Sequence, residues 1–380
     1  MTTALADVRP VDAVVLVPGF LGFDRVGGFY YFSERISATL RARLEVDAGR
    51  SVPVFPCCTL PIGSFETRQA FLVEQLTRLC DRFPSLRRLH LVGHSAGGVD
   101  VQLITCDRPV SGEWSGAAQR VRDKIRSVVA IAAPQRGTAL AKAAATRLLA
   151  DLSLANLRGI GSLARLFMDL VRLVPRQYNV FGKGLLGARS QLPEIARFLR
   201  QMFCHRDLLV DLLPERMAEL RARVRPDPRA KLTSFVTVAT LSAEVSVPPD
   251  PFFRQLYELT AQHAQGGDGV SAALSRLQGH GVPVIGGDAS TLADATVASS
   301  DGVVTSALQL LDPDDPAELA AVVVADHADV IGHYDRAPGP FDDRPPQEGM
   351  FHSGSGFDDD RFFQLYGRVG DAIARSMTPA

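Results

Sequence analysis

The chain has 380 residues, of which 46% are hydrophobic, and its formal net charge at pH 7 is −1. That length is enough for one large core with an inserted segment, or for two domains. The sequence has no lysine-rich run and no basic tail, so we expect no nucleic-acid partner. No apolar run is long enough to span a bilayer, so we expect no transmembrane segment.

The number of cysteines and the N-terminal residues indicate the cellular compartment. The five cysteines, which include the adjacent Cys57 and Cys58, show no metal-ligand spacing. An odd count argues against a complete disulfide framework and fits a reducing environment. Residues 1–19 lack the basic region and following apolar run of a signal peptide. We therefore expect a cytoplasmic protein, and secretion would require a leader that processing removes.

Short apolar runs, rich in β-branched residues, predict the strands. Val52–Phe55 contains Pro53, which cannot donate to a neighbouring strand, so we place this run near an edge of the sheet. The predicted strands are, in chain order, Val14–Val17, Val52–Phe55, the run that begins at Leu89, Ser127–Ala132, Leu232–Leu241 and Ala321–Ala325.

Amphipathic segments between these runs predict helices. Ser33 and Ser64 are candidate N-caps for helices that begin just after them. Further helices are expected over Ala96–Thr105, around Leu256 and Leu259, and at Arg361–Arg375. Strands that alternate with helices at this spacing indicate βαβ units, and hence an α/β fold with a mostly parallel central sheet flanked by helices.

The stretch from residue 138 to residue 230 has a different pattern. It contains no convincing strand but several amphipathic helices, whose apolar faces include Phe167 and Phe198, and a glycine-rich joint between two of them. Core helices have such faces too. We interpret the stretch as a helical cap or lid over the active site, inserted between core segments 1–137 and 231–380. Its apolar underside would bind an acyl chain.

A later stretch, Tyr334–Asp360, is rich in Pro, Gly, Asp and Ser. Such a composition is typical of loops, and we predict a long surface loop here.

The motif that carries chemistry is Leu89–Gly98, LHLVGHSAGG, in which Ser95 is framed by Gly93 and Gly97. This G-x-S-x-G pattern predicts a nucleophile elbow, a sharp turn between strand and helix that exposes the serine hydroxyl. A glycine-rich turn with an exposed serine is the alternative. The apolar run before the motif and the helix-compatible run after it favour the nucleophile.

A serine nucleophile needs a base, and the base needs an acid to orient it. With this kind of elbow the chain order is Ser, then Asp or Glu, then His. His327 lies just beyond the last predicted strand and is our candidate base, with His333 as its rival. Asp301, in the turn SSDGVV, is our candidate acid. The rival acids are Asp288 and Asp294, whereas Asp326 is a poor candidate because it adjoins the base.

Backbone N–H groups are the candidate oxyanion donors. The glycine-rich loop PGFLGFD follows the first strand, and we expect the N–H of Phe20 in this loop to act with that of Ala96. His94, inside the elbow, supports the turn or lines the pocket. With Leu21, Phe167 and Phe198 it completes the predicted substrate-binding residues.

Five segments in order, VLVPGFLGFD, LVGHSAGG, AAPQRGTALA, SSDGVV and DHADVIGH, resemble the bacterial triacylglycerol lipases of the Pseudomonas/Burkholderia type and their esterase relatives. The resemblance implies an α/β-hydrolase fold, a helical lid and ester hydrolysis on lipid-like substrates. It supports Ser95 as nucleophile, Asp301 as acid and His327 as base, with oxyanion donors at Phe20 and Ala96.

The chain departs from this family in two respects. The oxyanion loop has Pro18-Gly19 where the family usually has His-Gly, so a side-chain contact that orders the loop is missing. The family often holds a structural calcium, bound by an aspartate two residues after the catalytic histidine and by another aspartate. Asp329 matches the first of these, and Asp250 or Asp288 is the candidate for the second.

The sequence thus predicts a lipase-like serine hydrolase that cleaves hydrophobic acyl esters through an acyl-enzyme. The chemistry requires no cofactor, and the cap is expected to make transient contact with a lipid interface. The same residues would serve a thioesterase, a polyester depolymerase or an acyltransferase. An alternative from a different functional class is a non-catalytic binding protein with a hydrolase fold.

Overall fold

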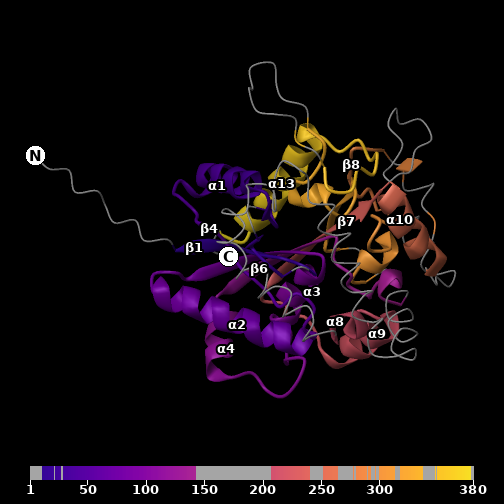
Figure 1. The fold of residues 1–380 in the computed structure, drawn as a ribbon. Helices are drawn as coiled ribbons and strands as arrows, with labels where there is room; N and C mark the ends of the chain where they lie inside the picture. Colours follow the sequence, from indigo (N-terminus) through magenta and orange to yellow (C-terminus); the bar gives the residue numbers. More distant parts are fainter. Residues whose placement is uncertain are drawn as a thin grey trace, which may run out of the picture.

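The structure is a computed structural model. It describes residues 11–20, 22–26, 29–142, 207–239, 251–263, 277, 280–288, 290–291, 296, 299–312, 317–336, 347 and 349–377. These residues contain a seven-stranded sheet in the order β4-β1-β5-β6-β7-β9-β8 (Figure 1), in which every neighbouring pair is parallel. The strands are β1 (Asp12–Val17), β4 (Val54–Pro56), β5 (Arg88–His94), β6 (Ile125–Ile131), β7 (Lys231–Val238), β8 (Val284–Ile285) and β9 (Leu319–Val324).

The predicted strands are confirmed, and β4 lies at an edge as Pro53 indicated. Side chains alternate between the two faces of the sheet, as the period of a strand requires. In β1, Val14 and Leu16 join the core on one face, whereas Val15 and Val17 join the core on the other. Both faces are therefore covered, as in other parallel sheets.

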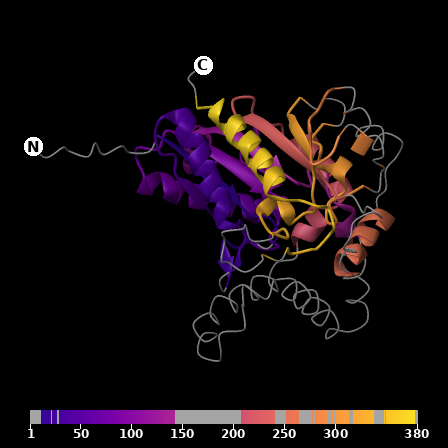
Figure 2. The ribbon, with the colours of Figure 1, turned by 90° about the horizontal axis from the view of Figure 1, so that it is seen from above.

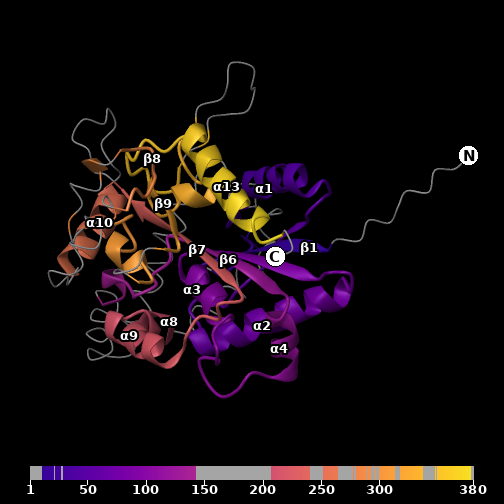
Figure 3. The ribbon, with the colours of Figure 1, turned by 180° about the vertical axis from the view of Figure 1, so that it is seen from behind.

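Helices form the two outer layers (Figures 1 and 3). On one face lie α1 (Glu34–Ala48) and α13 (Asp359–Ala374), and on the other lie α2 (Phe65–Arg82), α3 (Ala96–Leu103) and α4 (Gly116–Arg122). Ser64 caps α2 by accepting a hydrogen bond from the Thr67 N–H at 3.2 Å. Ser33 occupies the N-cap position of α1, but its side chain makes no capping bond.

The structure describes only part of the predicted cap, residues 138–230. Residues 143–206, which include Phe167 and Phe198, lie outside the described residues. The remainder forms α8 (Asp207–Asp211) and α9 (Pro214–Arg223). Their buried side chains pack with those of α3 and the start of α2, among them Leu208, Leu212, Met217, Leu220, Phe65, Val99 and Leu103. The cap and its boundaries stay a prediction.

In the described part of Tyr334–Asp360, residues 334–336, 347 and 349–360, the structure corrects the prediction of a long surface loop. Tyr334 is fully buried and donates a hydrogen bond to Asp359, which lies in α13, at 2.6 Å. Met350, Phe351 and Phe357 are buried as well. Isolated apolar residues anchor an otherwise polar, irregular segment, and a composition argument averages such anchors away.

Two smaller features complete the fold. Two short strands, β2 (Arg25–Val26) and β3 (Phe29–Tyr30), pair antiparallel and come after β1 in the chain. The helix α10 (Pro251–His263) lies at the side of the molecule (Figure 2). No helix in the described ranges is long and apolar enough to cross a membrane.

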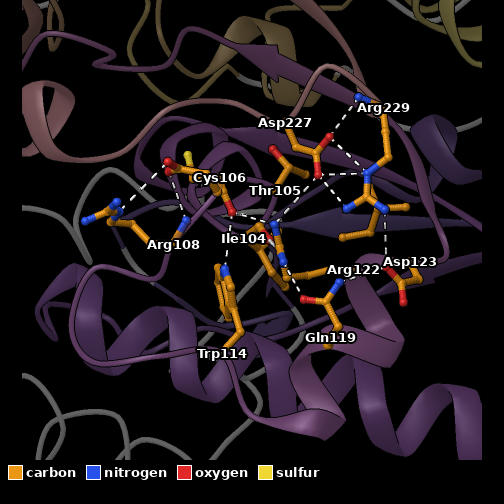
Figure 4. A network of polar contacts seen from close by, with 12 residues as sticks. Ile104, Thr105, Cys106, Arg108, Trp114, Gln119, Arg122, Asp123, Asp227 and Arg229 are labelled. Atoms are coloured by element: carbon orange, nitrogen blue, oxygen red, sulfur yellow. Dashed lines mark hydrogen bonds and ion pairs between the residues drawn. The ribbon is translucent and has the colours of Figure 1, made fainter.

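A polar network fastens the end of α3 to α4 and to the chain before β7 (Figure 4). Arg122 donates to the carbonyl oxygens of Cys106 at 2.5 Å and Ile104 at 3.1 Å, and its guanidinium lies 4.6 Å from the centre of the Trp114 ring. Asp227 lies 3.8 Å from the same guanidinium. The helix that follows Ser95 is therefore held at its far end by hydrogen bonds to backbone carbonyls.

Candidate active site

Ser95 lies in the turn between β5 and α3. Its backbone has φ 55° and ψ −134°, a positive φ that side-chain-bearing residues rarely adopt. Gly93 and Gly97 allow this turn, because a Cβ on Gly93 would collide with the Gly97 carbonyl and one on Gly97 with the Val17 carbonyl. The predicted strand–turn–helix conformation is thus present at Ser95, with the positive end of the α3 dipole beside it.

Asp301 and His327 lie together at the carboxyl end of the sheet. Nδ1 of His327 is 2.7 Å from Oδ2 of Asp301, and the His327 N–H donates to the Asp301 carbonyl at 3.0 Å. Because a carboxylate accepts, this contact places a proton on Nδ1 and leaves Nε2 as the acceptor. Asp301 is fully buried, and His327 is 8% exposed.

Other donors fix the Asp301 carboxylate. Its Oδ2 accepts the Thr237 hydroxyl at 2.6 Å and the Gln309 amide at 3.3 Å. Its Oδ1 accepts the backbone N–H groups of Val303 at 3.0 Å and Val304 at 2.7 Å. A buried carboxylate with this many donors is held in one orientation toward the histidine.

The rival candidates have other contacts. Nε2 of His333 donates to the carbonyls of Tyr30 at 3.0 Å and Tyr31 at 2.9 Å, and burial lowers the pKa of His333 to about 4. Asp288 is exposed and accepts the Ser290 hydroxyl, and Asp294 lies outside the described residues. Among the described candidates, the structure brings together Asp301 and His327.

His94 forms part of the surroundings of His327. The ring centres of the two histidines are 4.6 Å apart. The Tyr31 hydroxyl lies 2.8 Å from Nδ1 of His94. Burial, and then the neighbouring His327, lower the pKa of His94 well below its usual value. A neutral His94 can support the His327 ring without opposing a positive charge there. Sequence reasoning did not identify Tyr31, because no local pattern distinguishes it from the other aromatic residues.

The loop with the predicted oxyanion donor Phe20 lies beside Ser95. A Cβ on Gly19 would stand 2.5 Å from the Ser95 Cβ, so only glycine permits this approach. Phe20 is half-buried, Ala96 is buried, and Leu21 lies outside the described residues. The close approach places the backbone around Phe20 next to the nucleophile.

A buried ion pair contacts the loop that contains Phe20. Arg68 of α2 lies 2.5 Å from the Asp100 carboxylate of α3, and both side chains are fully buried. The same guanidinium donates to the carbonyls of Pro18 and Gly19, each at 3.3 Å. Burial raises the pKa of Asp100, and the Arg68 charge offsets only part of this effect. Sequence reasoning missed the pair, because neither residue belongs to a motif.

Asp329, the predicted calcium ligand, is buried next to His327. Its Oδ2 accepts the Asp326 N–H at 2.8 Å and the Ser355 hydroxyl at 2.6 Å. Burial, and then the Asp326 charge, raise the pKa of Asp329 well above its usual value. Of the candidate partners, Asp288 is exposed, and Asp250 is outside the described residues.

Among the described residues, no group of three or more His, Cys, Asp or Glu side chains is arranged to hold a metal ion. Oδ2 of Asp329 accepts hydrogen bonds from two protein donors. The calcium site stays a prediction, since Asp250 lies outside the described residues.

A cavity of about 970 Å³ lies away from these residues. It is lined by the start of α2, by residues 107–112 and by α9, with basic and acidic side chains in similar number. Neither Ser95 nor His327 lines it, and we assign it no part in the chemistry.

Comparisons with known proteins support the fold. No protein-family model matches the chain, and no curated protein matches it by sequence. Solved structures similar to it include EstA from Clostridium botulinum, with a TM-score of 0.54 and 17% identity, where the match covers 97% of this chain and 88% of that one.

Two further structures resemble the whole chain. The Staphylococcus hyicus lipase has a TM-score of 0.53 and 16% identity, with 97% of each chain covered. Lipase 1 from Pelosinus fermentans has a TM-score of 0.54 and 14% identity, with 98% of this chain and 100% of that one covered. These likenesses and the parallel sheet show an α/β-hydrolase-type fold.

Proposed function

We propose that the protein is a serine carboxylic-ester hydrolase. The observation that carries the proposal is the 2.7 Å contact between His327 and Asp301, at the same end of the sheet as the strained turn of Ser95. Such a serine, histidine and carboxylate in this chain order form the nucleophile, base and orienting acid of an acyl-transfer site. The names of the similar solved structures, two lipases and EstA, agree with this proposal.

In the proposed mechanism, the Ser95 hydroxyl attacks the ester carbonyl while Nε2 of His327 takes its proton. Asp301 holds the Nδ1–H and stabilises the imidazolium. The N–H groups of Phe20 and Ala96 stabilise the oxyanion. His327 then gives the proton to the leaving alcohol. Water, activated by His327, attacks the acyl-enzyme and releases the acid.

An apolar cluster beside the site supports a hydrophobic substrate. Ala328, next to the base, and Val303, near the acid, belong to one cluster with residues of α10 and of the segment after Gly349. Its other members are Ala239, Phe253, Met350 and Phe351, with Phe23, Leu256 and Tyr257 partly buried against them. Partly exposed aromatic and aliphatic side chains next to a reacting centre favour apolar acyl groups.

Within this activity we propose a lipase-like role on acylglycerols or similar esters. The resemblance to lipases of the Pseudomonas/Burkholderia type supports it, as does the apolar cluster. Residues 138–230 would form the lid and contact the lipid interface.

The test is hydrolysis of p-nitrophenyl esters from acetate to palmitate by the wild type and by Ser95→Ala. We expect a preference for longer chains and loss of activity in the variant, together with loss of fluorophosphonate labelling. Full activity in Ser95→Ala would refute the assignment. A folded wild type that neither hydrolyses esters nor reacts with the probe would be a binding protein. Labelling without ester hydrolysis would indicate another acyl donor.

A further inference from the structure

We propose that Ser355 is a positioning residue, which holds the turn of His327 in place through Asp329. The inference rests on the proposed function, in which His327 is the base. Ser355 belongs to the segment predicted as a surface loop, and no catalytic motif includes it.

The turn of His327 is closed by two reciprocal hydrogen bonds. The Asp326 N–H donates to Oδ2 of Asp329 at 2.8 Å, and the Asp329 N–H donates to Oδ1 of Asp326 at 2.9 Å. The Ala328 N–H also donates to Oδ1 of Asp326, at 2.8 Å. His327 lies between the two aspartates, so its backbone follows the geometry of this closed turn.

Ser355 connects the turn to a second part of the chain. Its hydroxyl donates to Oδ2 of Asp329 at 2.6 Å and accepts the Phe357 N–H at 3.2 Å. Arg361 of α13 donates to the Ser355 carbonyl at 2.8 Å. Ser355 is 8% exposed, so water does not readily replace its hydroxyl at Asp329. The Ser355 hydroxyl therefore ties the turn to a buried segment and to α13, and Ser353 of the same segment also hydrogen-bonds the Asp326 side chain.

The base is thus held from two sides. Asp301 holds the ring and the backbone N–H of His327, and the Ser355–Asp329 contact holds the turn that carries it. Since reacting atoms must stay within a fraction of an ångström of the productive geometry, a looser turn slows proton transfer. The Ser355 hydroxyl contacts Asp329 and the Phe357 N–H, neither of which is a proposed substrate-binding residue, so a looser turn should leave substrate binding unchanged. We therefore expect Ser355 to affect kcat and not KM.

The Ser355–Asp329 contact involves the residue that was predicted to bind calcium. A metal ion at Asp329 would tie the turn to neighbouring segments, and here a serine hydroxyl makes that connection. If the hydroxyl is sufficient, the wild-type activity does not depend on a divalent cation.

The experiment compares Ser355→Ala with Ser355→Thr, which keeps the hydroxyl, and with Ser355→Cys, which keeps a weak donor. Ser115→Ala is the matched control, since it removes the serine that caps α4 far from the site. For each folded variant, kcat, KM, the melting temperature and fluorophosphonate labelling are measured, with and without a calcium chelator.

We expect kcat of Ser355→Ala to fall roughly 10-fold or more at unchanged KM, with near-full rescue by Thr and an intermediate value for Cys. Ser115→Ala should lose stability but keep kcat. An unchanged kcat in Ser355→Ala, or in Ser355→Cys if the alanine variant does not fold, would overturn the inference. So would loss of wild-type activity on chelation. If Ser95→Ala stays active, the proposed function itself fails, which is a separate result.

Discussion

The replacement of Arg68 by methionine tests how the oxyanion loop is held. Arg68 and Asp100 are fully buried and 2.5 Å apart. Removal of one partner of a buried pair leaves an uncompensated charge and typically costs about 3–5 kcal/mol. The carbonyls of Leu60, Pro18 and Gly19 also lose a donor. A large part of the total stability of about 5–15 kcal/mol would be lost.

The double variant Arg68→Met/Asp100→Leu separates the charge from the hydrogen bonds. Replacement of both partners of a buried ion pair by apolar residues is often neutral, because no uncompensated charge is left. We therefore expect the double variant to be more stable than Arg68→Met by roughly 2–3 kcal/mol, with the carbonyl bonds still lost.

Urea unfolding gives these free energies, and ester hydrolysis gives kcat for the same proteins. We expect kcat to fall in both variants, because the carbonyls next to Phe20 lose their donor. If Arg68→Met is within 1 kcal/mol of the wild type, or if the two substitutions are additive, the reasoning is wrong.

Two further predictions concern buried carboxylates. Asp301→Asn should reduce kcat by roughly 10³–10⁴-fold with little change in KM, because an amide does not hold His327 in the Nδ1–H tautomer. Steady-state kinetics measures both constants. A loss of kcat below tenfold would argue against Asp301 as the acid. Asp12 is buried beside His90 and Arg88. Burial raises its pKa, but hydrogen bonds from His90 and Arg88 outweigh burial and lower it to about 2, from an ordinary 3.8. The stability from this lowered pKa, about 2 kcal/mol, is present above pH 4 and is lost as the pH falls through 2. In thermal unfolding, the stability gap between the wild type and Asp12→Asn should therefore narrow from pH 6 to pH 3, and a constant gap would contradict the assignment.

Much of the candidate site could be predicted, because its signals are local in the sequence. The glycines around Ser95 report steric contacts within a few residues, and the apolar run before them reports burial of β5. The chain order of serine, acid and histidine narrowed the partners, but Asp288, Asp294 and His333 stayed open. In the structure His327 contacts Asp301, whereas His333 contacts two backbone carbonyls.

The supporting residues could not be predicted. Tyr31 and Arg68 each act through a partner distant in the sequence, and neither has a local pattern that distinguishes it from a core aromatic or a surface arginine. Ser355 lies in a stretch whose polar composition indicated a surface loop, although single apolar residues in its described part are buried. Composition averages over such anchors, whereas packing depends on each of them.

The sequence by itself determined the parallel sheet and the strained turn at Ser95, because side-chain alternation and glycine sterics act over a few neighbouring residues. Only the tertiary structure decided which acid meets which histidine, and how the loop of Phe20 and the turn of His327 are held. Asp301 and His327 are 26 residues apart, and Arg68 and Asp100 are 32 apart. Contacts at such separations form only when the packed strands and helices bring the segments together, so no short pattern encodes them.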